Sequence, residues 1–190
     1  MKIAVAMSGG VDSSVTAALL KDQGHKVIGL TMRLTDESES AVEDARKNCE
    51  ILGIEHYIAD FRETFDREII SYFEHEYRAG RTPNPCVRCN RFIKFGVLWE
   101  KAAELGAEYL ATGHYARLER TGKEILLKKG TDEKKDQSYF LCRLSAEQLE
   151  HTLFPLGKMT KARVKQIARE KMLPAASRPE SQDICFKPRM

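Results

Sequence analysis

Three cysteines lie in segments without helical or strand periodicity, where thiols can take part in chemistry. Cys86 and Cys89 form a C-x-x-C pair in a proline-containing stretch predicted to be a loop, residues 81–90, and Cys185 lies in a second irregular segment. Such a pair indicates a redox dithiol, half of a zinc site or iron–sulfur ligands. Three thiolates are one short of a closed zinc shell. They suit a 4Fe–4S cluster with one open position, or a persulfide on one cysteine that another resolves.

The other two cysteines are expected to be structural. Cys49 lies on the apolar face of a predicted helix over residues 41–52, and Cys142 follows an apolar segment, so both are predicted to pack in the core. An odd number of cysteines argues against a disulfide framework.

A second group of chemistry-bearing residues is the glycine turn Ser8–Ser14, which lies between an apolar run and a predicted helix. Its adjacent glycines allow close approach of the backbone, and its hydroxyls and the free N–H groups of the helix N-terminus favour a phosphate. The spacing of a Walker lysine is absent. The turn therefore predicts a phosphate site without a lysine of its own.

The elements that position these residues alternate as strands and helices. Strands are predicted at residues 3–7, 26–32, 54–59 and 108–112, and helices between them, including residues 61–77 and 92–105. This order predicts an α/β fold with a doubly wound parallel sheet. Ligands of such sheets bind beyond the carboxyl ends of the strands, so the glycine turn, Met32, the cysteine loop and Gly113-His114 are expected at one edge.

The remaining third of the chain predicts smaller elements. Residues 116–119 and 124–128 read as a hairpin, and Ser145 as the cap of a helix that extends to about residue 153. Thr160 caps another helix, with Lys161, Lys165 and Arg169 facing outward. We predict an ATP-binding core over residues 1–143 and a small helical appendage over 144–190 that completes the site with Cys185.

Composition agrees with one globular domain of the cell interior. The 190 residues are 42% hydrophobic and 31% charged, and no apolar run approaches the ~20 residues that span a bilayer, so a cytoplasmic protein is expected. Residues 158–190 hold nine Lys or Arg and three Asp or Glu. This basic stretch suggests either a footprint for a polyanion or a solvated helix face.

The motifs together resemble a known family. Ser8–Ser13 resembles the pyrophosphatase (PP) loop of enzymes that cut ATP between its α and β phosphates. Six further segments closely resemble the tRNA-specific 2-thiouridylases: residues 80–85, 89–90, 93–95, 111–115, 135–141 and 184–186. The resemblance covers nearly the whole chain. It implies an adenine nucleotide alpha hydrolase-like fold and an enzyme that uses ATP to replace the 2-oxygen of the wobble uridine of tRNA with sulfur.

The resemblance also implies a role for each matching position. The nucleotide would be bound by Ala6, Met7, Ser8, Gly9, Gly10, Val11, Asp12 and Ser13, with Met32 and Gly113 around the adenosine. The catalytic thiols would be Cys89 as nucleophile and Cys185 as its persulfide partner. The target base would face Asn84, Pro85 and Cys86, and the tRNA would contact Lys135, Asp136 and Gln137.

The chemistry of the reaction supports these assignments. The C2 carbonyl of uridine is a poor electrophile, and adenylation of O2 turns that oxygen into part of AMP, which a sulfur nucleophile displaces. Asp12, beside the phosphate turn, is a candidate Mg²⁺ ligand, because Mg²⁺ prefers carboxylate and phosphate oxygens. The alternative is that Asp12 only caps the helix.

The chain departs from the family pattern in two ways. The commoner pattern has aspartate at the position of Cys86, so a third thiolate predicts a cluster-dependent variant, with 4Fe–4S held by Cys86, Cys89 and Cys185; persulfide chemistry is the alternative. Relatives also continue into C-terminal domains that grip tRNA, so this chain is a minimal member or a shortened form.

Partners and rival functions follow from the same resemblance. We expect tRNA and a sulfur donor, either sulfide or a persulfide carrier protein, no membrane, and a homodimer as one possible assembly. The rival functions are another PP-loop sulfur transferase, acting on a tRNA cytidine or a small molecule, and a non-catalytic nucleotide- or tRNA-binding module.

Overall fold

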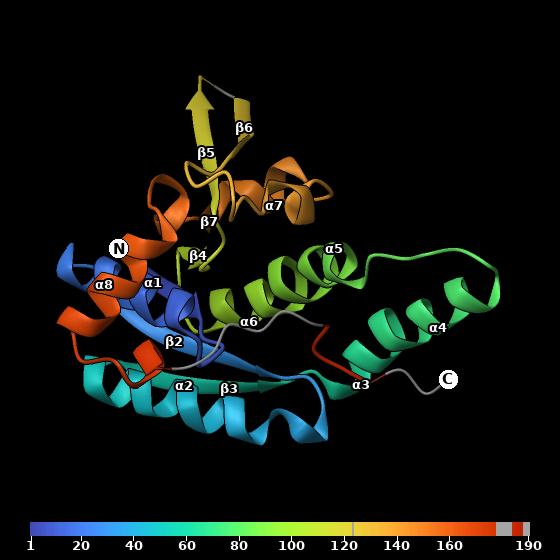
Figure 1. The fold of residues 1–190 in the computed structure, drawn as a ribbon, viewed down its shortest axis with the longest axis horizontal. Coiled ribbons are helices and arrows are strands. Elements are labelled where there is room, and N and C mark those ends of the chain that lie inside the picture. The colour runs from blue at the N-terminus through green and yellow to red at the C-terminus, as the bar shows by residue number, and fades with distance from the viewer. Residues whose placement is uncertain (123, 178–183, 188–190) are drawn as a thin grey trace.

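The centre of the molecule is a five-stranded sheet (Figure 1) in a computed structural model that describes residues 1–122, 124–177 and 184–187. The strand order is β3 (Glu55–Asp60), β2 (Lys26–Arg33), β1 (Lys2–Ala6), β4 (Tyr109–Ala111) and β7 (Thr152–Leu153). Every neighbouring pair is parallel. The predicted doubly wound parallel sheet is therefore confirmed.

Helices cover both faces of the sheet because alternate residues of each strand point to opposite sides. Ile3 and Val5 pack into one core with α1 (Val11–Asp22), α2 (Glu39–Leu52) and α8 (Lys161–Glu170). Ala4 packs into a second core with α6 (Leu98–Glu104) on the other face. Cys49 is fully buried in the first core, as predicted.

The region after β3 is helical over residues 61–77, as predicted, and differs from the prediction from Pro85 onward. The predicted helix over residues 61–77 is present as α3 (Arg62–Phe65), a π-helical turn (Asp66–Ile70) and α4 (Ser71–Arg78). The predicted loop over residues 81–90 is wrong from Pro85 onward, where α5 (Pro85–Cys89) begins. Asn84 Oδ1 accepts the N–H groups of Cys86 and Val87 at 3.1 and 3.2 Å, and proline suits the first helical position.

The chain continues from α5 through a second π-helical segment, Asn90–Val97, into α6. Single π-helical turns interrupt α-helices often at functional sites. This one separates the C-x-x-C pair from the helix that packs on the sheet.

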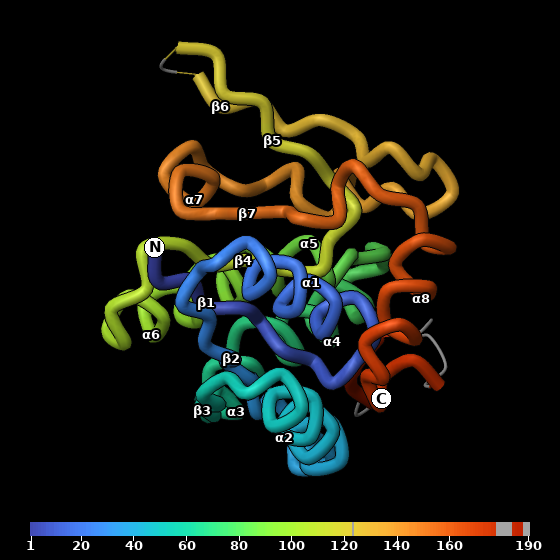
Figure 2. Tube along the Cα trace, turned by 90° about the vertical axis from the view of Figure 1, so that its left-hand side faces the viewer, coloured from blue at the N-terminus to red at the C-terminus, as the bar shows by residue number. Residues whose placement is uncertain are grey.

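The last third of the chain adds one strand to the sheet. The predicted hairpin is confirmed as the antiparallel pair β5 (Ala116–Thr121) and β6 (Glu124–Lys129), which lies at the opposite end of the molecule from α2 (Figure 2). Ser145 Oγ accepts the N–H of Gln148 at 3.2 Å and caps α7 (Ala146–Glu150). The predicted helix to about residue 153 is wrong, because Thr152–Leu153 pair with β4.

Four short 3₁₀ turns complete the connections, at Asp36–Ser38, Ser138–Leu141, Pro155–Lys158 and Pro174–Ser177. Thr160 caps α8 as predicted, since its hydroxyl accepts the N–H of Arg163 at 3.3 Å. The division of the chain at residue 143 into a core and an appendage stays a prediction.

Candidate nucleotide and thiol site

The glycine turn after β1 is held in shape by its own serines. Gly9 adopts a φ of 74°, a left-handed conformation that glycine enters without strain. Ser13 Oγ accepts the N–H of Ser8 at 3.2 Å and donates to the Gly10 carbonyl at 3.1 Å, and Ser14 Oγ donates to the same carbonyl at 2.9 Å. The turn therefore leads directly into the N-terminus of α1, at the carboxyl end of β1.

Asp12, in the first turn of α1, forms an ion pair with a lysine from the far end of the chain. Lys161 Nζ lies 2.7 Å from each of the two carboxylate oxygens, and the Tyr115 hydroxyl donates to Oδ1 at 2.8 Å. Lys161 is 7% exposed, so the prediction that its side chain faces outward is wrong. Positions 161, 164 and 168 share one helix face, and the apolar Val164 and Ala168 are the sequence signal that places Lys161 inward.

The surroundings of Asp12 do not suit a Mg²⁺ ligand. Mg²⁺ binds through carboxylate oxygens and prefers near-ideal octahedral geometry, whereas both oxygens of Asp12 already accept hydrogen bonds from a cation, and one from a hydroxyl as well. Over the described ranges, no group of three or more His, Cys, Asp or Glu side chains is arranged to hold a metal ion. Magnesium binding by Asp12 stays a prediction that the observed ion pair disfavours.

Gly113, after β4, lies directly against the phosphate loop. A Cβ atom at this position would be 2.8 Å from the carbonyl carbon of Asp12 and 2.9 Å from the backbone nitrogen of Ser13. Only glycine fits there without displacing the loop. Met32, near the end of β2, packs against both the second core and the cluster that contains Cys89. Contacts of Met32 and Gly113 with an adenosine stay predictions.

The three predicted thiols differ in exposure. Cys86 is exposed and Cys89 is buried; burial raises the pKa of the Cys89 thiol to about 12, which Lys94 opposes in part. Cys185 reaches the surface, yet partial burial of its thiol raises its pKa as well. A thiolate at Cys86 would raise both of these pKa values further.

Phe186 holds the segment around Cys185 against α3 and α4. Its ring packs edge-on against Phe65 and Phe73, with centroid distances of 5.8 and 5.3 Å. All three rings belong to one buried cluster with Cys89 and Ile93. The residue after Cys185 thus packs in the same cluster as Cys89, and a site formed by all three thiols stays a prediction. Cys142, predicted to be buried, is exposed.

Thiols are the ligand type that a 4Fe–4S cluster binds. In the described part of the chain, however, these thiols are not arranged as metal ligands. Four Cys thiolates usually hold a 4Fe–4S cluster, so Cys86, Cys89 and Cys185 would supply three ligands and leave one iron open. All three thiols would have to lose their protons, and the raised pKa values of Cys89 and Cys185 oppose this for two of them.

Lys94 is a positive charge that acts on two of the thiols and on His114. It lies in the π-helical segment after Cys89, and its charge lowers the pKa values of Cys89, Cys185 and His114. His114 is next to Gly113, which touches the phosphate loop. Burial is the main reason that the pKa of His114 is well below its usual range, and Nδ1 lies 2.7 Å from the Thr112 hydroxyl.

The residues predicted to contact tRNA make contacts within the protein. Asp136 accepts hydrogen bonds from Gly130 N at 2.8 Å and from the Ser138 hydroxyl at 2.8 Å. Burial alone would raise the pKa of Asp136, but these bonds outweigh it and lower the pKa. Gln137 Oε1 accepts the N–H of Tyr115 at 3.1 Å. Asp136 and Gln137 therefore fix the segment after β6, and tRNA contacts by residues 135–137 stay a prediction.

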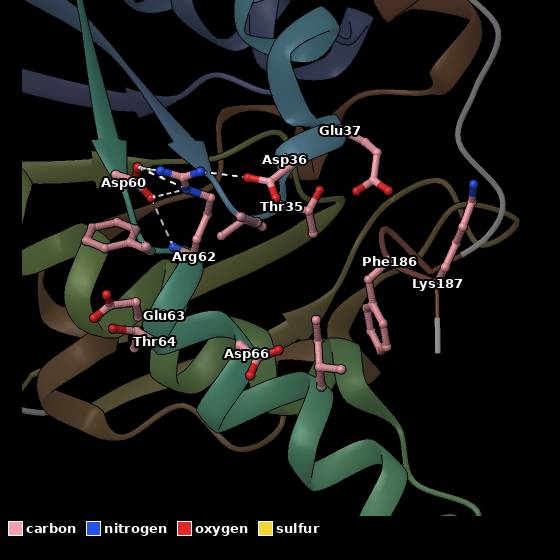
Figure 3. A pocket seen from close by; sticks show the side chains of 13 residues that line it. Thr35, Asp36, Glu37, Asp60, Arg62, Glu63, Thr64, Asp66, Phe186 and Lys187 are labelled. Atoms are coloured by element: carbon pink, nitrogen blue, oxygen red, sulfur yellow. Dashed lines mark hydrogen bonds and ion pairs between the residues drawn. The ribbon is translucent and has the colours of Figure 1, made fainter. Parts of the chain in front are cut away.

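A cavity of about 930 Å³ opens near the carboxyl ends of β2 and β3 (Figure 3). In it, Arg62 lies between Asp60 and Asp36, with nitrogen–oxygen distances of 2.8 and 2.6 Å, and Phe186 lines another part of the wall. The lining has five carboxylates and two cations: Asp36, Glu37, Asp60, Glu63, Asp66, Arg62 and Lys187. This acidic lining disfavours a triphosphate, and a phosphate site at the glycine turn stays a prediction.

Among the described residues, every helix is too short or too polar to cross a membrane.

The sequence is similar to proteins named as tRNA thiouridylases. It is 56% identical to "tRNA-specific 2-thiouridylase MnmA 1" of Caldanaerobacter subterraneus subsp. tengcongensis, over 98% of this chain and 56% of that protein. It is 49% identical to "tRNA-specific 2-thiouridylase MnmA" of Clostridioides difficile, over 97% of this chain and 55% of that protein. The chain therefore spans about half the length of these relatives.

Solved structures share the fold at low sequence identity. The U34-tRNA thiolase NcsA of Methanococcus maripaludis, described with its [4Fe-4S] cluster, superposes with a TM-score of 0.61 and 22% identity, over 92% of this chain and 58% of that one. A 4-thiouridine synthetase in complex with RNA and ATP gives a TM-score of 0.62 and 16% identity, over 94% and 42%. A family model described as "tRNA methyl transferase HUP domain" matches residues 1–189. This match, over nearly the whole chain, shows that the chain belongs to the family of that HUP domain.

Proposed function

We propose that this domain carries out ATP-dependent 2-thiolation of a tRNA uridine. The observation that carries the proposal is a shared buried cluster, in which Phe186, the residue after Cys185, packs together with Cys89. The high identity to proteins named 2-thiouridylases supports the choice of uridine O2 as the reacting atom. A tRNA substrate also favours a cytoplasmic location.

The proposed reaction has two steps. Uridine O2 attacks the α-phosphorus of ATP, and pyrophosphate leaves, with the N–H groups at the start of α1 favouring the negative charge of the phosphates. A sulfur nucleophile then attacks C2, and the carbon–oxygen bond breaks, so that O2 departs as part of AMP. The uridine must leave its base stack to reach such a site.

The sulfur chemistry rests on the three thiols. A bound 4Fe–4S cluster would supply an open position for an exogenous sulfide, and its protein ligands would be Cys86, Cys89 and Cys185. The NcsA structure contains such a cluster, but at 22% identity its likeness is one of fold, so the proposal depends on the thiols of this chain. In the persulfide alternative, Cys185 carries the terminal sulfur and Cys89 resolves it, with a persulfide carrier protein as donor.

The test uses anaerobically purified protein with unmodified tRNA, ATP and sulfide, and counts 2-thiouridine by nucleoside mass spectrometry. Cys89→Ser is expected to abolish the product, and Cys142→Ser, at an exposed cysteine outside the site, is expected to leave it unchanged. Iron and acid-labile sulfide near four each per chain support the cluster. Their absence, with product formed only when a persulfide donor replaces sulfide, supports persulfide chemistry. A wild type that binds tRNA and ATP but forms no 2-thiouridine contradicts the proposed function.

A homodimer is one assembly that we expect for this domain, and light scattering of the same preparation tests it. The basic stretch 158–190 is partly neutralised within the fold, because Arg163 pairs with Glu170 at 3.1 Å and Lys171 with Asp22 at 2.6 Å. We therefore expect only part of its charge to be available for tRNA, and a correspondingly modest salt dependence of binding.

A further inference from the structure

Aromatic rings and guanidinium groups alternate in a stack between α4 and the π-helical segment that follows α5. The guanidinium carbon of Arg88 lies 4.5 Å from the centre of the Tyr72 ring and 4.6 Å from the centre of the Phe92 ring. The guanidinium carbon of Arg91 lies 5.3 Å from the centre of the same Phe92 ring. Phe92 is 38% exposed and Arg91 is exposed as well. The stack therefore reaches solvent at Phe92 and Arg91.

The guanidinium in the middle of the stack is fixed by hydrogen bonds. Arg88 Nε donates to the Glu68 carbonyl at 2.6 Å, and a terminal nitrogen donates to Glu68 Oε2 at 2.9 Å. Arg67 pairs with the same carboxylate at 3.0 Å. Three arginines, Arg67, Arg88 and Arg91, thus lie in or beside the stack with one glutamate, a net charge of +2. The surface combines a held aromatic ring with positive charge.

The stack lies beside a thiol that the proposed reaction uses. Arg88 directly precedes Cys89 in α5, and Tyr72 directly precedes Phe73, which shares a buried cluster with Cys89. Cys89 and Phe92 are three positions apart in continuous helical backbone, a separation at which Cβ atoms are about 5–6 Å apart. A base on the stack and a base brought to Cys89 would therefore be close neighbours.

Stability is a weak reason for this arrangement. Cation–π contacts at exposed sites contribute little to folding, and a single exposed apolar side chain needs no special explanation. Here, however, the exposed ring is combined with guanidinium groups and a positive charge. Aromatic rings and arginine planes are the side chains on which unpaired bases of RNA stack, and the positive charge complements the phosphates. An acidic protein segment would use the charge but not the flat face of the ring.

We propose that Phe92 and Arg91 form a stacking platform for an unpaired nucleotide of the RNA substrate, next to the target base, with Arg88 and Tyr72 as the residues that position the ring. This inference rests on the proposed function, because it names a further contact of the same RNA. The base stacks on the exposed part of Phe92, and Arg91 contacts that base or its phosphate. Stacking accepts every base, so the platform holds the loop without reading its sequence.

The test measures RNA binding without ATP or sulfide, so that it does not depend on the thiolation chemistry. Fluorescence anisotropy compares a tRNA anticodon stem-loop with a fully paired RNA duplex of the same length. Loss of one stacked base corresponds to a weakening of about 5- to 150-fold. We expect that loss for the stem-loop in Phe92→Ala, an unchanged duplex affinity, and wild-type binding of both RNAs in Phe92→Trp. Tyr77→Ala is the matched control, because Tyr77 is 41% exposed and packs on Phe73.

Two further measurements separate stacking from charge. A stem-loop with 2-aminopurine beside the target uridine is expected to change its fluorescence on binding to the wild type but not to Phe92→Ala. In Arg91→Gln, the slope of log K against log salt concentration is expected to fall in magnitude by about 0.7, the value for one phosphate of a single strand. Phe92→Leu, which keeps an apolar side chain on the helix, serves if Phe92→Ala does not fold, and is expected to bind the stem-loop as weakly.

Several outcomes overturn the inference. These are wild-type stem-loop affinity in a folded Phe92→Ala or Phe92→Leu, equal losses for the stem-loop and the duplex, or an equal loss in Tyr77→Ala. Unchanged RNA binding with slower sulfur transfer from a persulfide donor would assign the surface to a protein partner instead. A wild type that binds the stem-loop as expected but forms no 2-thiouridine overturns only the proposed function.

Discussion

The ring of Phe186 lies edge-on to the ring of Phe73, with centroids 5.3 Å apart and planes at 90°. This contact joins a residue near the end of the described chain to α4, and both rings belong to the cluster that also contains Cys89 of the C-x-x-C pair. Phe186 is 8% exposed and shares its cluster with Cys89. The position of the third thiol thus depends on aromatic packing and not on the cysteines themselves.

Phe186→Ala is therefore expected to lower thiolation although all three thiols remain. Loss of the ring removes the packing that holds residues 184–187, and the cost in unfolding free energy is about 3 kcal/mol or more for a fully buried ring. Alkylation of Cys185 should become faster at the same time. The measurement is the rate of Cys185 modification beside the 2-thiouridine yield, with Phe186→Leu as the variant expected to retain most of both; an unchanged Cys185 rate in Phe186→Ala would contradict this account.

The thiols are expected to differ in reactivity. Cys86 and Cys142 are exposed, whereas Cys89 is buried with a pKa raised to about 12. Because the thiolate is the reactive form and its fraction rises tenfold per pH unit below the pKa, alkylation of Cys89 should speed up about 100-fold between pH 8 and pH 10. Peptide mass spectrometry after timed iodoacetamide treatment of the metal-free protein gives the rates. A Cys89 rate that levels off above pH 8 would show an ordinary, accessible thiol instead.

His114 is expected to make stability depend on pH on the acid side. Its pKa in the folded protein is well below the usual value, so between that pKa and ~6.5 the unfolded chain binds a proton that the folded chain does not. Stability contributed by the neutral ring is present above about pH 6.5 and falls as the pH falls, by up to about 1.4 kcal/mol per pH unit. Urea unfolding at pH 7.5 and 5.5 measures the difference.

His114→Asn is the matched variant for this prediction. It removes one titrating group and leaves His56, whose pKa is also lowered by burial. The loss of stability between pH 7.5 and 5.5 should be smaller in the variant than in the wild type. An equal loss in both proteins would mean that His114 binds its proton in the folded state.

The elements built from local patterns are those that the sequence predicts well. The apolar strand at residues 3–7, the glycine that ends α2 and the alternation of strands and helices determine the parallel sheet and the edge where its ligands bind. The cap signal of Asn84 followed by Pro85 is equally local, and it indicates the start of α5 in the stretch predicted to be a loop.

Contacts between distant segments are what local patterns do not contain. The pair of Asp12 and Lys161 joins residues 149 positions apart, and its existence follows from the packing of α8 on α1. Likewise β7 is only two residues long, too short for a period-2 pattern, and is a strand because β4 offers it a partner. The side chains of Asp136 and Gln137 fold back on the protein for the same tertiary reason.

The proposed reaction requires that the uridine oxygen that attacks ATP is the same oxygen that sulfur later displaces from C2. The measurement that tests it most directly uses tRNA whose target uridine carries ¹⁸O at position 2, incubated with the anaerobic protein, ATP and sulfide. The account predicts one ¹⁸O atom in the AMP for each 2-thiouridine formed, and neither product in Cys89→Ser. AMP without ¹⁸O alongside 2-thiouridine, or ¹⁸O released as water, would contradict it.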